Sequence, residues 1–181
     1  MTFRKAVNYM QTQIKKTIDN VDDKILNKIL ELILSSERIF IYGVGRSGLI
    51  GKAFAMRLGH LGLNVNVIGE TITPPTARGD TLIIVSGSGR TISSNRIALA
   101  AKKLGANIIV ITANKKSPLI KLSTASLVPF GPEDGGRSRF APLGTLFEDS
   151  CLILLDGLVA ELMEKLHETE ETMHSRHGTL G

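Results

Sequence analysis

The chain reads RIFIYGVGRSG from Arg38 to Gly48. An apolar run of strand length that passes directly into a glycine-rich turn and a helix is typical of the first strand of a parallel α/β sheet. The glycines fit the spacing G-x-G-x-x-G, which lets the N-terminus of a helix come close to a phosphate group. This stretch therefore predicts a fold class and an anion-binding loop together.

The same alternation of apolar runs and helical patterns continues along the chain. Further strands are predicted at 64–68, 81–85, 107–111 and 125–129, and helices at 47–61, 91–104 and 143–167. The runs at 81–85 and 107–111 are apolar on both faces, which suits a parallel sheet covered on both sides. The sequence predicts an α/β fold, namely a three-layer αβα sandwich with a five-stranded parallel sheet.

Two amphipathic segments precede the first strand. Apolar residues recur at three- and four-residue spacing through 3–18 and again through 22–35, which predicts an N-terminal helical hairpin. A loop that contains glycine and proline is expected at 130–142, ahead of the long last helix.

Composition excludes several classes of protein. The chain has 181 residues, of which 43% are hydrophobic and 22% charged, as in a globular protein and unlike a disordered one. It has no membrane-spanning run and no secretory signal, so we expect a cytoplasmic protein that does not bind membranes. The net charge of +5 favours anionic ligands, but the low aromatic content argues against nucleic acid. Cys151, the single cysteine, is expected to be a buried, inert thiol.

A second loop of the same kind follows the run at 81–85. It reads Ser86-Gly87-Ser88-Gly89-Arg90-Thr91 and leads into a predicted helix. Hydroxyls and free backbone amides at a helix N-terminus form an anion cradle without any lysine. One such loop is explained equally well by a capped turn, but two of them at strand ends in one short domain favour a phosphate site.

Other phosphate and hydrolase motifs are absent from the sequence. Neither loop has the G-x-x-x-x-G-K-[ST] pattern of nucleoside triphosphatases, and there is no G-x-S-x-G elbow of a serine hydrolase. A dinucleotide site stays open on the first loop, because Glu70 lies near the position where such a site places an acid. His174 and His177 form H-x-x-H without a suitably spaced third ligand, so no metal is expected.

Together these motifs resemble the sugar isomerase (SIS) domain family, and in detail its 6-phospho-3-hexuloisomerase branch. The loops at 43–48 and 86–91 are shared across the family. The branch-specific part is the combination of M-R-L-x-H-L-G at 56–62, P-x-G-T-x-F-E at 142–148 and the late pair Arg176-His177. The resemblance covers nearly the whole chain. It implies one SIS domain over 1–181, with N-terminal helices at 1–36, an α/β core at 37–168 and a C-terminal tail at 169–181.

The resemblance implies an isomerase that interconverts 3-hexulose 6-phosphate and fructose 6-phosphate through an enediolate, without a metal or cofactor. Such an enzyme serves the ribulose monophosphate pathway, in formaldehyde fixation or pentose phosphate supply, and is linked in function to 3-hexulose-6-phosphate synthase. The alternatives are another aldose–ketose isomerase, such as an arabinose 5-phosphate isomerase, and a non-catalytic regulator that binds sugar phosphates. Apolar stripes on the terminal helices favour a homo-oligomer, with a tetramer expected.

This chemistry needs a base near the carbon, donors for the enediolate oxygens and a phosphate grip. Glu148 is the first choice for the base, although it also suits the dipole of its helix; His60 and His177 are the other catalytic candidates. The charges after Leu166 predict a tail that projects away from its own core, so that His177 acts on substrate in an adjacent subunit. Substrate and phosphate binding are assigned to Gly45, Arg46, Ser47, Ser86, Gly87, Ser88, Gly89 and Thr91.

Overall fold

The computed structural model describes residues 1–129 and 135–179. Its five strands form one sheet, in which all neighbours are parallel and the order is β2-β1-β3-β4-β5. The strands are β1 (Ile39–Gly43), β2 (Val65–Val67), β3 (Thr81–Val85), β4 (Asn107–Ile111) and β5 (Ala125–Leu127). The predicted five-stranded parallel sheet is confirmed.

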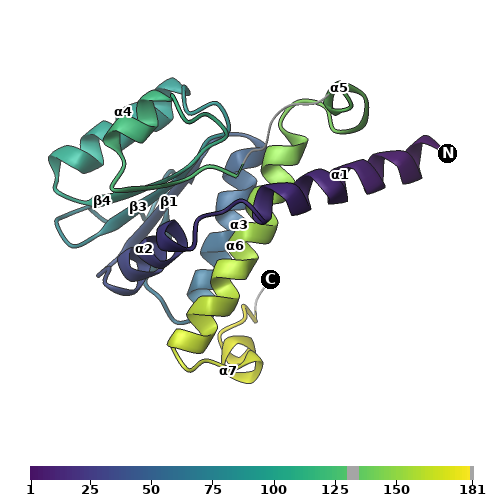
Figure 1. The fold of residues 1–181 in the computed structure, drawn as a ribbon. Helices are drawn as coiled ribbons and strands as arrows, with labels where there is room; N and C mark the ends of the chain where they lie inside the picture. The colour runs from purple at the N-terminus through teal and green to yellow at the C-terminus, as the bar shows by residue number, and fades with distance from the viewer. Residues whose placement is uncertain (130–134, 180–181) are drawn as a thin grey trace.

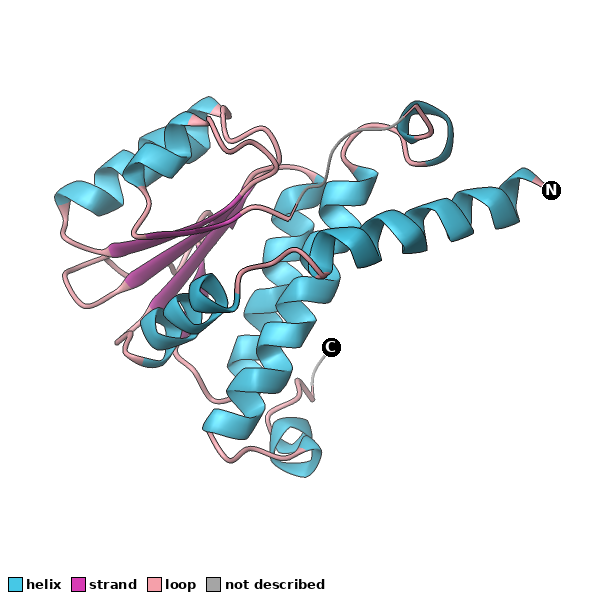
Figure 2. Ribbon diagram, viewed as in Figure 1, coloured by secondary structure: helices cyan, strands magenta, loops and turns pink. Residues whose placement is uncertain are grey.

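Helices cover both faces of this sheet, as Figures 1 and 2 show. The helices are α1 (Thr2–Ile18), α2 (Asp23–Leu34), α3 (Arg46–His60), α4 (Ile92–Lys103), α5 (Arg137–Phe140), α6 (Thr145–Lys165) and α7 (Glu170–Ser175), with the 3-10 helix η1 (Pro118–Leu122). One face packs on α2, α3 and α6, and the other on α4 and η1. Within the described ranges, no helix has both the length and the apolar character needed to cross a membrane.

Alternate residues of the three central strands, β1, β3 and β4, enter the two layers of the core. Ile83 and Val85 of β3 pack in the layer of α2, α3 and α6, whereas Leu82 and Ile84 pack in the layer of α4. All five residues of β3 are buried, which explains why the sequence is apolar on both faces there. Full burial of each such side chain contributes about 1.5–3 kcal/mol to folding.

The two N-terminal helices form, but the predicted hairpin between them is wrong. Helix α2 packs its apolar face, which includes Ile29 and Ile33, against β5 and α6. That face therefore packs mainly on β5 and α6 rather than on α1. Helix α1 instead packs on α6 and α5 and extends beyond the core, which leaves Phe3 exposed near the N-terminus (Figure 1).

The C-terminal segment also differs from expectation. It folds back as α7, and Nη1 of Arg176 donates to the carbonyl oxygen of His60 (2.9 Å) and pairs with Glu168 (2.8 Å). The expectation that the tail projects away from its own core is wrong. The guanidinium of Arg176 pairs with Glu168 of the same segment and also hydrogen-bonds to the carbonyl at the C-terminal end of α3, which holds the segment against that helix. The predicted loop at 130–142 contains α5, while its residues 130–134, like 180–181, lie outside the described part.

Candidate active site

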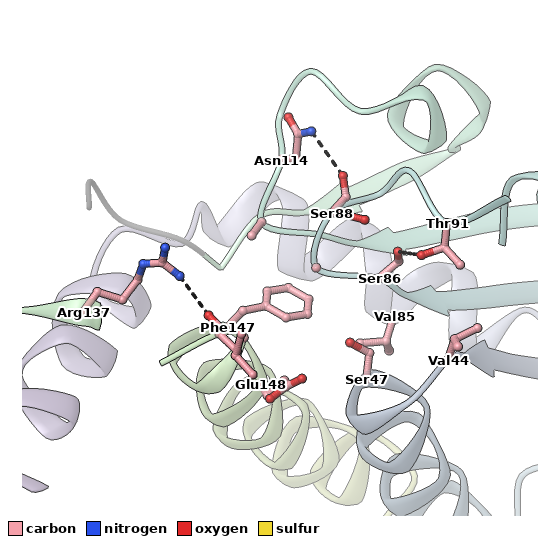
Figure 3. A pocket seen from close by; sticks show the side chains of 14 residues that line it. Val44, Ser47, Val85, Ser86, Ser88, Thr91, Asn114, Arg137, Phe147 and Glu148 are labelled. Carbon is pink, nitrogen blue, oxygen red and sulfur yellow. Dashed lines mark hydrogen bonds between the residues drawn. The ribbon is translucent and has the colours of Figure 1, made fainter. Parts of the chain in front are cut away.

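A cavity of about 430 Å³ opens at the carboxyl ends of β1 and β3. Its lining residues, most of them labelled in Figure 3, are Val44, Ser47, Val85, Ser86, Gly87, Ser88, Thr91, Ala113, Asn114, Arg137, Leu143, Gly144, Phe147 and Glu148. The chain leaves β1 toward one edge of the sheet and β3 toward the other, and ligands of open parallel sheets bind at such a switch point. Both predicted anion-binding loops therefore end at the same cavity.

The first loop joins β1 to α3 through a turn that only glycines allow. A β-carbon on Gly48 would lie 2.6 Å from the carbonyl oxygen of Gly43, and Gly45 has a φ of +61°. This close approach places Ser47 in the first turn of α3, with its side chain toward the cavity (Figure 3). The helix N-terminus thus presents its free amides to whatever binds there.

The second loop joins β3 to α4 and carries three hydroxyls around the cavity. Oγ of Ser86 lies 3.5 Å from Oγ1 of Thr91, the N-cap residue of α4 (Figure 3). The amide of Arg90 donates to Oγ of Ser88 at 3.2 Å. Ser86 itself is buried, so its hydroxyl is held in place before any ligand arrives.

Two side chains that follow β4 hydrogen-bond to the backbone of this loop. Nδ2 of Asn114 donates to the carbonyl oxygen of Ser88, and Oγ1 of Thr112 donates to that of Gly87, both at 3.2 Å. Gly89 has a φ of +61°, and a β-carbon there would lie 2.4 Å from Cβ of Ser117. The loop is therefore fixed by contacts that leave no room for a side chain at position 89.

Glu148 lies at the start of α6 and points into the same cavity (Figure 3). Its Oε2 lies 2.6 Å from Nε of Arg46, the first residue of α3, and Nη2 of Arg46 lies 3.9 Å from Oδ1 of Asp149. The side chain of Glu148 is only 11% exposed, whereas that of Arg46 is 63% exposed. A nearly buried carboxylate thus faces the cavity with a cation beside it, an arrangement that can accept a proton from a bound substrate.

The two histidine candidates lie at the opposite end of α3. His60 ends that helix, about 21 Å from Arg46 at 1.5 Å per residue, and its ring centroid is 5.1 Å from that of His177. Burial, followed by the nearby His177 and Arg57, lowers the pKa of His60 below its usual value. Within one chain the structure therefore joins Glu148 to the two predicted anion-binding loops but does not join either histidine to them.

The structure also bears on the dinucleotide and metal sites that the sequence raised. Glu70, the acid that a dinucleotide site would use, lies outside the cavity and pairs with Nζ of Lys52 at 2.9 Å. In the described ranges, no three His, Cys, Asp or Glu side chains gather into a group that could hold a metal.

The cavity is also lined by residues that were not assigned to the site from the sequence, among them Asn114, Phe147 and Arg137. Asn114 is the third residue after the end of β4, so the rule that loops after parallel strands form the site could have identified it. Phe147 precedes Glu148 and packs beside Gly87. Arg137 lies in the segment expected to be a loop, where nothing in the sequence indicates its role; its Nη1 donates to the carbonyl oxygen of Leu143 at 2.8 Å.

Comparison with known proteins agrees with this geometry. The family model described as the SIS domain matches residues 32–135, which include both predicted anion-binding loops. This chain belongs to the SIS domain family. The predicted family is thereby confirmed.

Relatives of this SIS protein match along most of their length. The 3-hexulose-6-phosphate isomerase of Bacillus subtilis is 40% identical over 164 residues, which cover 88% of this chain and 89% of the relative. The 3-hexulose-6-phosphate isomerase of Methanocaldococcus jannaschii is 40% identical over 155 residues, covering 86% and 83%. A Methanococcus jannaschii crystal structure, described as inferring a molecular function of 3-hexulose-6-phosphate isomerase, has a TM-score of 0.87 at 36% identity and covers both chains completely.

Proposed function

We propose that this SIS protein is a 3-hexulose-6-phosphate isomerase, which interconverts 3-hexulose 6-phosphate and fructose 6-phosphate. The observation that carries the proposal is that the carboxylate of Glu148 faces the same cavity as the hydroxyls of Ser47, Ser86 and Thr91. A sugar phosphate needs both groups, one for its anion and one for its acidic carbon. Relatives about 40% identical that bear this name support the choice of substrate.

The phosphate grip comes from two helix N-termini. Ser47 belongs to α3, while Ser86, Ser88 and Thr91 belong to the loop that leads into α4. Backbone amides at these ends, with the hydroxyls, donate hydrogen bonds to phosphate oxygens, and the helix dipoles favour the negative charge. Because Gly45, Gly87 and Gly89 have no side chains, the backbone of both loops can come close to the phosphate.

Glu148 is the base in this proposal. It takes the proton from C2 of 3-hexulose 6-phosphate, and the electron pair of that bond forms the C2–C3 double bond of an enediolate, whose negative charge lies on the former C3 carbonyl oxygen. Return of the proton to C3 leaves the ketone at C2. The stabilisation of the enediolate oxygens is assigned to the guanidinium of Arg46, which contacts Glu148.

One proton must also move from the C2 oxygen to the C3 oxygen, and a group that titrates near neutral pH suits this transfer. We assign it to His177 from an adjacent subunit, together with His60 beside it, because the histidines of the same chain lie at the far end of α3. His177 is exposed and so is available to a neighbour. Opening of the furanose ring of fructose 6-phosphate is the other task that this imidazole fits.

The assignment implies further properties that belong to the same proposal. We expect a cytoplasmic homotetramer whose subunits share sites. We place its reaction in the ribulose monophosphate pathway, where 3-hexulose-6-phosphate synthase supplies the substrate for formaldehyde fixation, or where the reverse direction supplies pentose phosphates.

A turnover assay tests this function. Purified protein is given 3-hexulose 6-phosphate, and fructose 6-phosphate is measured through a coupled dehydrogenase, with Glu148→Gln as the matched control. We expect turnover by the wild type and little by the variant. Binding of the sugar phosphate without turnover would indicate a regulator, and turnover of arabinose 5-phosphate alone would indicate an aldose–ketose isomerase.

A further inference from the structure

A tight turn at residues 142–145 lies beside the cavity, where the chain enters α6. The amide of Thr145 donates to the carbonyl oxygen of Pro142 at 3.3 Å and closes the turn. Leu143, its first central residue, has a φ of +58°, whereas Gly144, the second, has a φ of −90° and a ψ of 4°. Turns with a positive φ at the first central position normally have glycine there. In this turn leucine occupies the strained position and glycine the unstrained one.

The carboxylate of Glu148 explains the glycine at the second central position. A β-carbon on Gly144 would lie 3.0 Å from Oε1 of Glu148 and 3.1 Å from its Cδ. A side chain at position 144 would therefore displace the carboxylate that faces the cavity. Glycine is needed beneath the carboxylate, and the positive φ falls on Leu143.

The side chain of Leu143 is not explained by packing within the chain. Leu143 lines the cavity and is 90% exposed, so it lies at the opening of the cavity. Its carbonyl oxygen accepts a hydrogen bond from Nη1 of Arg137 at 2.8 Å, which helps to hold the turn (Figure 3). A positive φ on leucine destabilises the folded chain, and a side chain in solvent gives little in return. Strain of this kind beside a cavity indicates a role in what the cavity binds.

We propose that the side chain of Leu143 covers the bound sugar phosphate on its solvent side and shields the proton that Glu148 carries. Consecutive Cα atoms are about 3.8 Å apart, so Leu143 begins one residue away from the backbone that lies against the carboxylate. A sugar carbon within reach of Glu148 therefore also meets Leu143. The shielding of the proton rests on the proposed function, whereas the cover over a bound sugar does not.

Shielding matters because one proton leaves a carbon and returns to its neighbour. Glu148 takes the proton from C2 of 3-hexulose 6-phosphate, the electron pair of that C–H bond forms the C2–C3 double bond, and the carboxylic acid then protonates C3. While the acid holds the proton, water can exchange it. An apolar side chain over the opening limits this exchange, so that most passages return the original proton. Repeated passages in deuterated water still label C3.

Two glycine variants separate the strain from the function. Among the described residues, Leu143 and His167 are the non-glycine residues with a positive φ, and His167 (φ +55°) follows α6 and does not line the cavity. Leu143→Gly and His167→Gly should each keep or raise the midpoint of unfolding in urea, because glycine adopts a positive φ without strain. A lower midpoint in Leu143→Gly alone would give the leucine a structural role and overturn the proposal.

Deuterium incorporation tests the shield, and calorimetry tests the cover. Each protein is incubated briefly with fructose 6-phosphate in deuterated water, and the deuterium in both ketoses is compared with the amount of new ketose formed. Leu143→Gly should raise this ratio several-fold and weaken fructose 6-phosphate binding by about tenfold, the usual effect of losing an apolar contact with a ligand. His167→Gly should change neither quantity, and the conservative Leu143→Met should stay close to the wild type in both.

The outcomes distinguish this inference from the proposed function. If the wild type is active and Leu143→Gly keeps its ratio and its affinity, the inference is wrong and the function stands. If Leu143→Gly loses mass by light scattering, the leucine belongs to a contact between copies of the chain and the inference is again wrong. If the wild type binds fructose 6-phosphate without turnover or exchange, the function is wrong. Weaker binding by Leu143→Gly would then still support the cover, and equal binding would overturn it.

Discussion

Nε of Arg46 lies 2.6 Å from Oε2 of Glu148, and this ion pair joins the first turn of α3 to the first turns of α6. The carboxylate is nearly buried and its partner is largely exposed, so the cation can shift toward a substrate while the acid stays in place. One short contact therefore links the residue proposed to move the proton with the residue proposed to stabilise the charge that results.

Replacement of the base should remove turnover and preserve binding. We expect Glu148→Gln to lower kcat by about 10² to 10⁴-fold, the usual contribution of a positioned base. Affinity for fructose 6-phosphate, measured by calorimetry, should hardly change because the phosphate grip is untouched. The neighbouring Asp149→Asn is the control and should keep most of the activity. A wild-type rate in Glu148→Gln would leave Glu148 with the role of a helix-end residue only.

Mixed oligomers test whether sites are shared between chains. His177→Ala and Glu148→Gln should each be nearly inactive alone. After mixing and reassembly, some sites draw both intact groups from different chains, and random mixing should restore about one quarter of the wild-type rate. A fully active His177→Ala would mean that the C-terminal segment has no role in catalysis. Inactivity that mixing does not relieve would place His177 in its own subunit.

The second phosphate loop should not tolerate a side chain at Gly89. Gly89→Ala forces a positive φ on alanine and brings its β-carbon against Ser117, so we expect a loss of about 1–3 kcal/mol in the free energy of unfolding. Phosphate affinity should fall with it. Gly157→Ala is the control, because it lies in α6 with open space around it, and it should stabilise the helix by about 0.5–1 kcal/mol. Equal stability of both variants in urea would contradict the account of the loop.

Stability should decrease on acidification through His60. Because burial lowers the pKa of His60 in the folded chain, the unfolded chain binds the proton first as the pH falls below about 6.5, the usual histidine value. The free energy of unfolding should therefore drop between that pH and the lowered pKa. Urea titrations across this range should show a smaller drop in His60→Gln than in the wild type. The same slope in both proteins would remove His60 as the cause.

Much of the fold could be predicted from the sequence, because strands such as 81–85 and 107–111 are apolar on both faces and leave few alternatives to a covered parallel sheet. The two anion-binding loops followed from their glycines and hydroxyls. The direction of α1 could not be predicted, since periodicity shows which face of a helix is apolar but not which element covers it. The fold of the C-terminal segment depends on Arg176 reaching His60, more than a hundred residues earlier in the chain.

For the site, the sequence identified individual residues but not the contacts between residues that lie far apart in the chain. Glu148 was predicted as the base from its place in the opening turns of a helix, but its contact with Arg46 joins two helices that are far apart in the sequence and leaves no local pattern. The same holds for Asn114, whose support of the second loop depends on two strands being neighbours in the sheet. That His60 lies far from Glu148 likewise follows only from the length and direction of α3 in the structure.

Deuterium exchange tests the central claim, that this SIS protein moves a ketone between C2 and C3 of a hexose phosphate. Fructose 6-phosphate is incubated with the protein in deuterated water and followed by proton and carbon NMR, with Glu148→Gln alongside. The account predicts that the wild type introduces deuterium at C3 and forms a second ketose while the C1 protons stay unlabelled, and that the variant gives neither the exchange at C3 nor the second ketose. Exchange at C1, which marks an aldose–ketose isomerase, or neither exchange at C3 nor a second ketose, would contradict it.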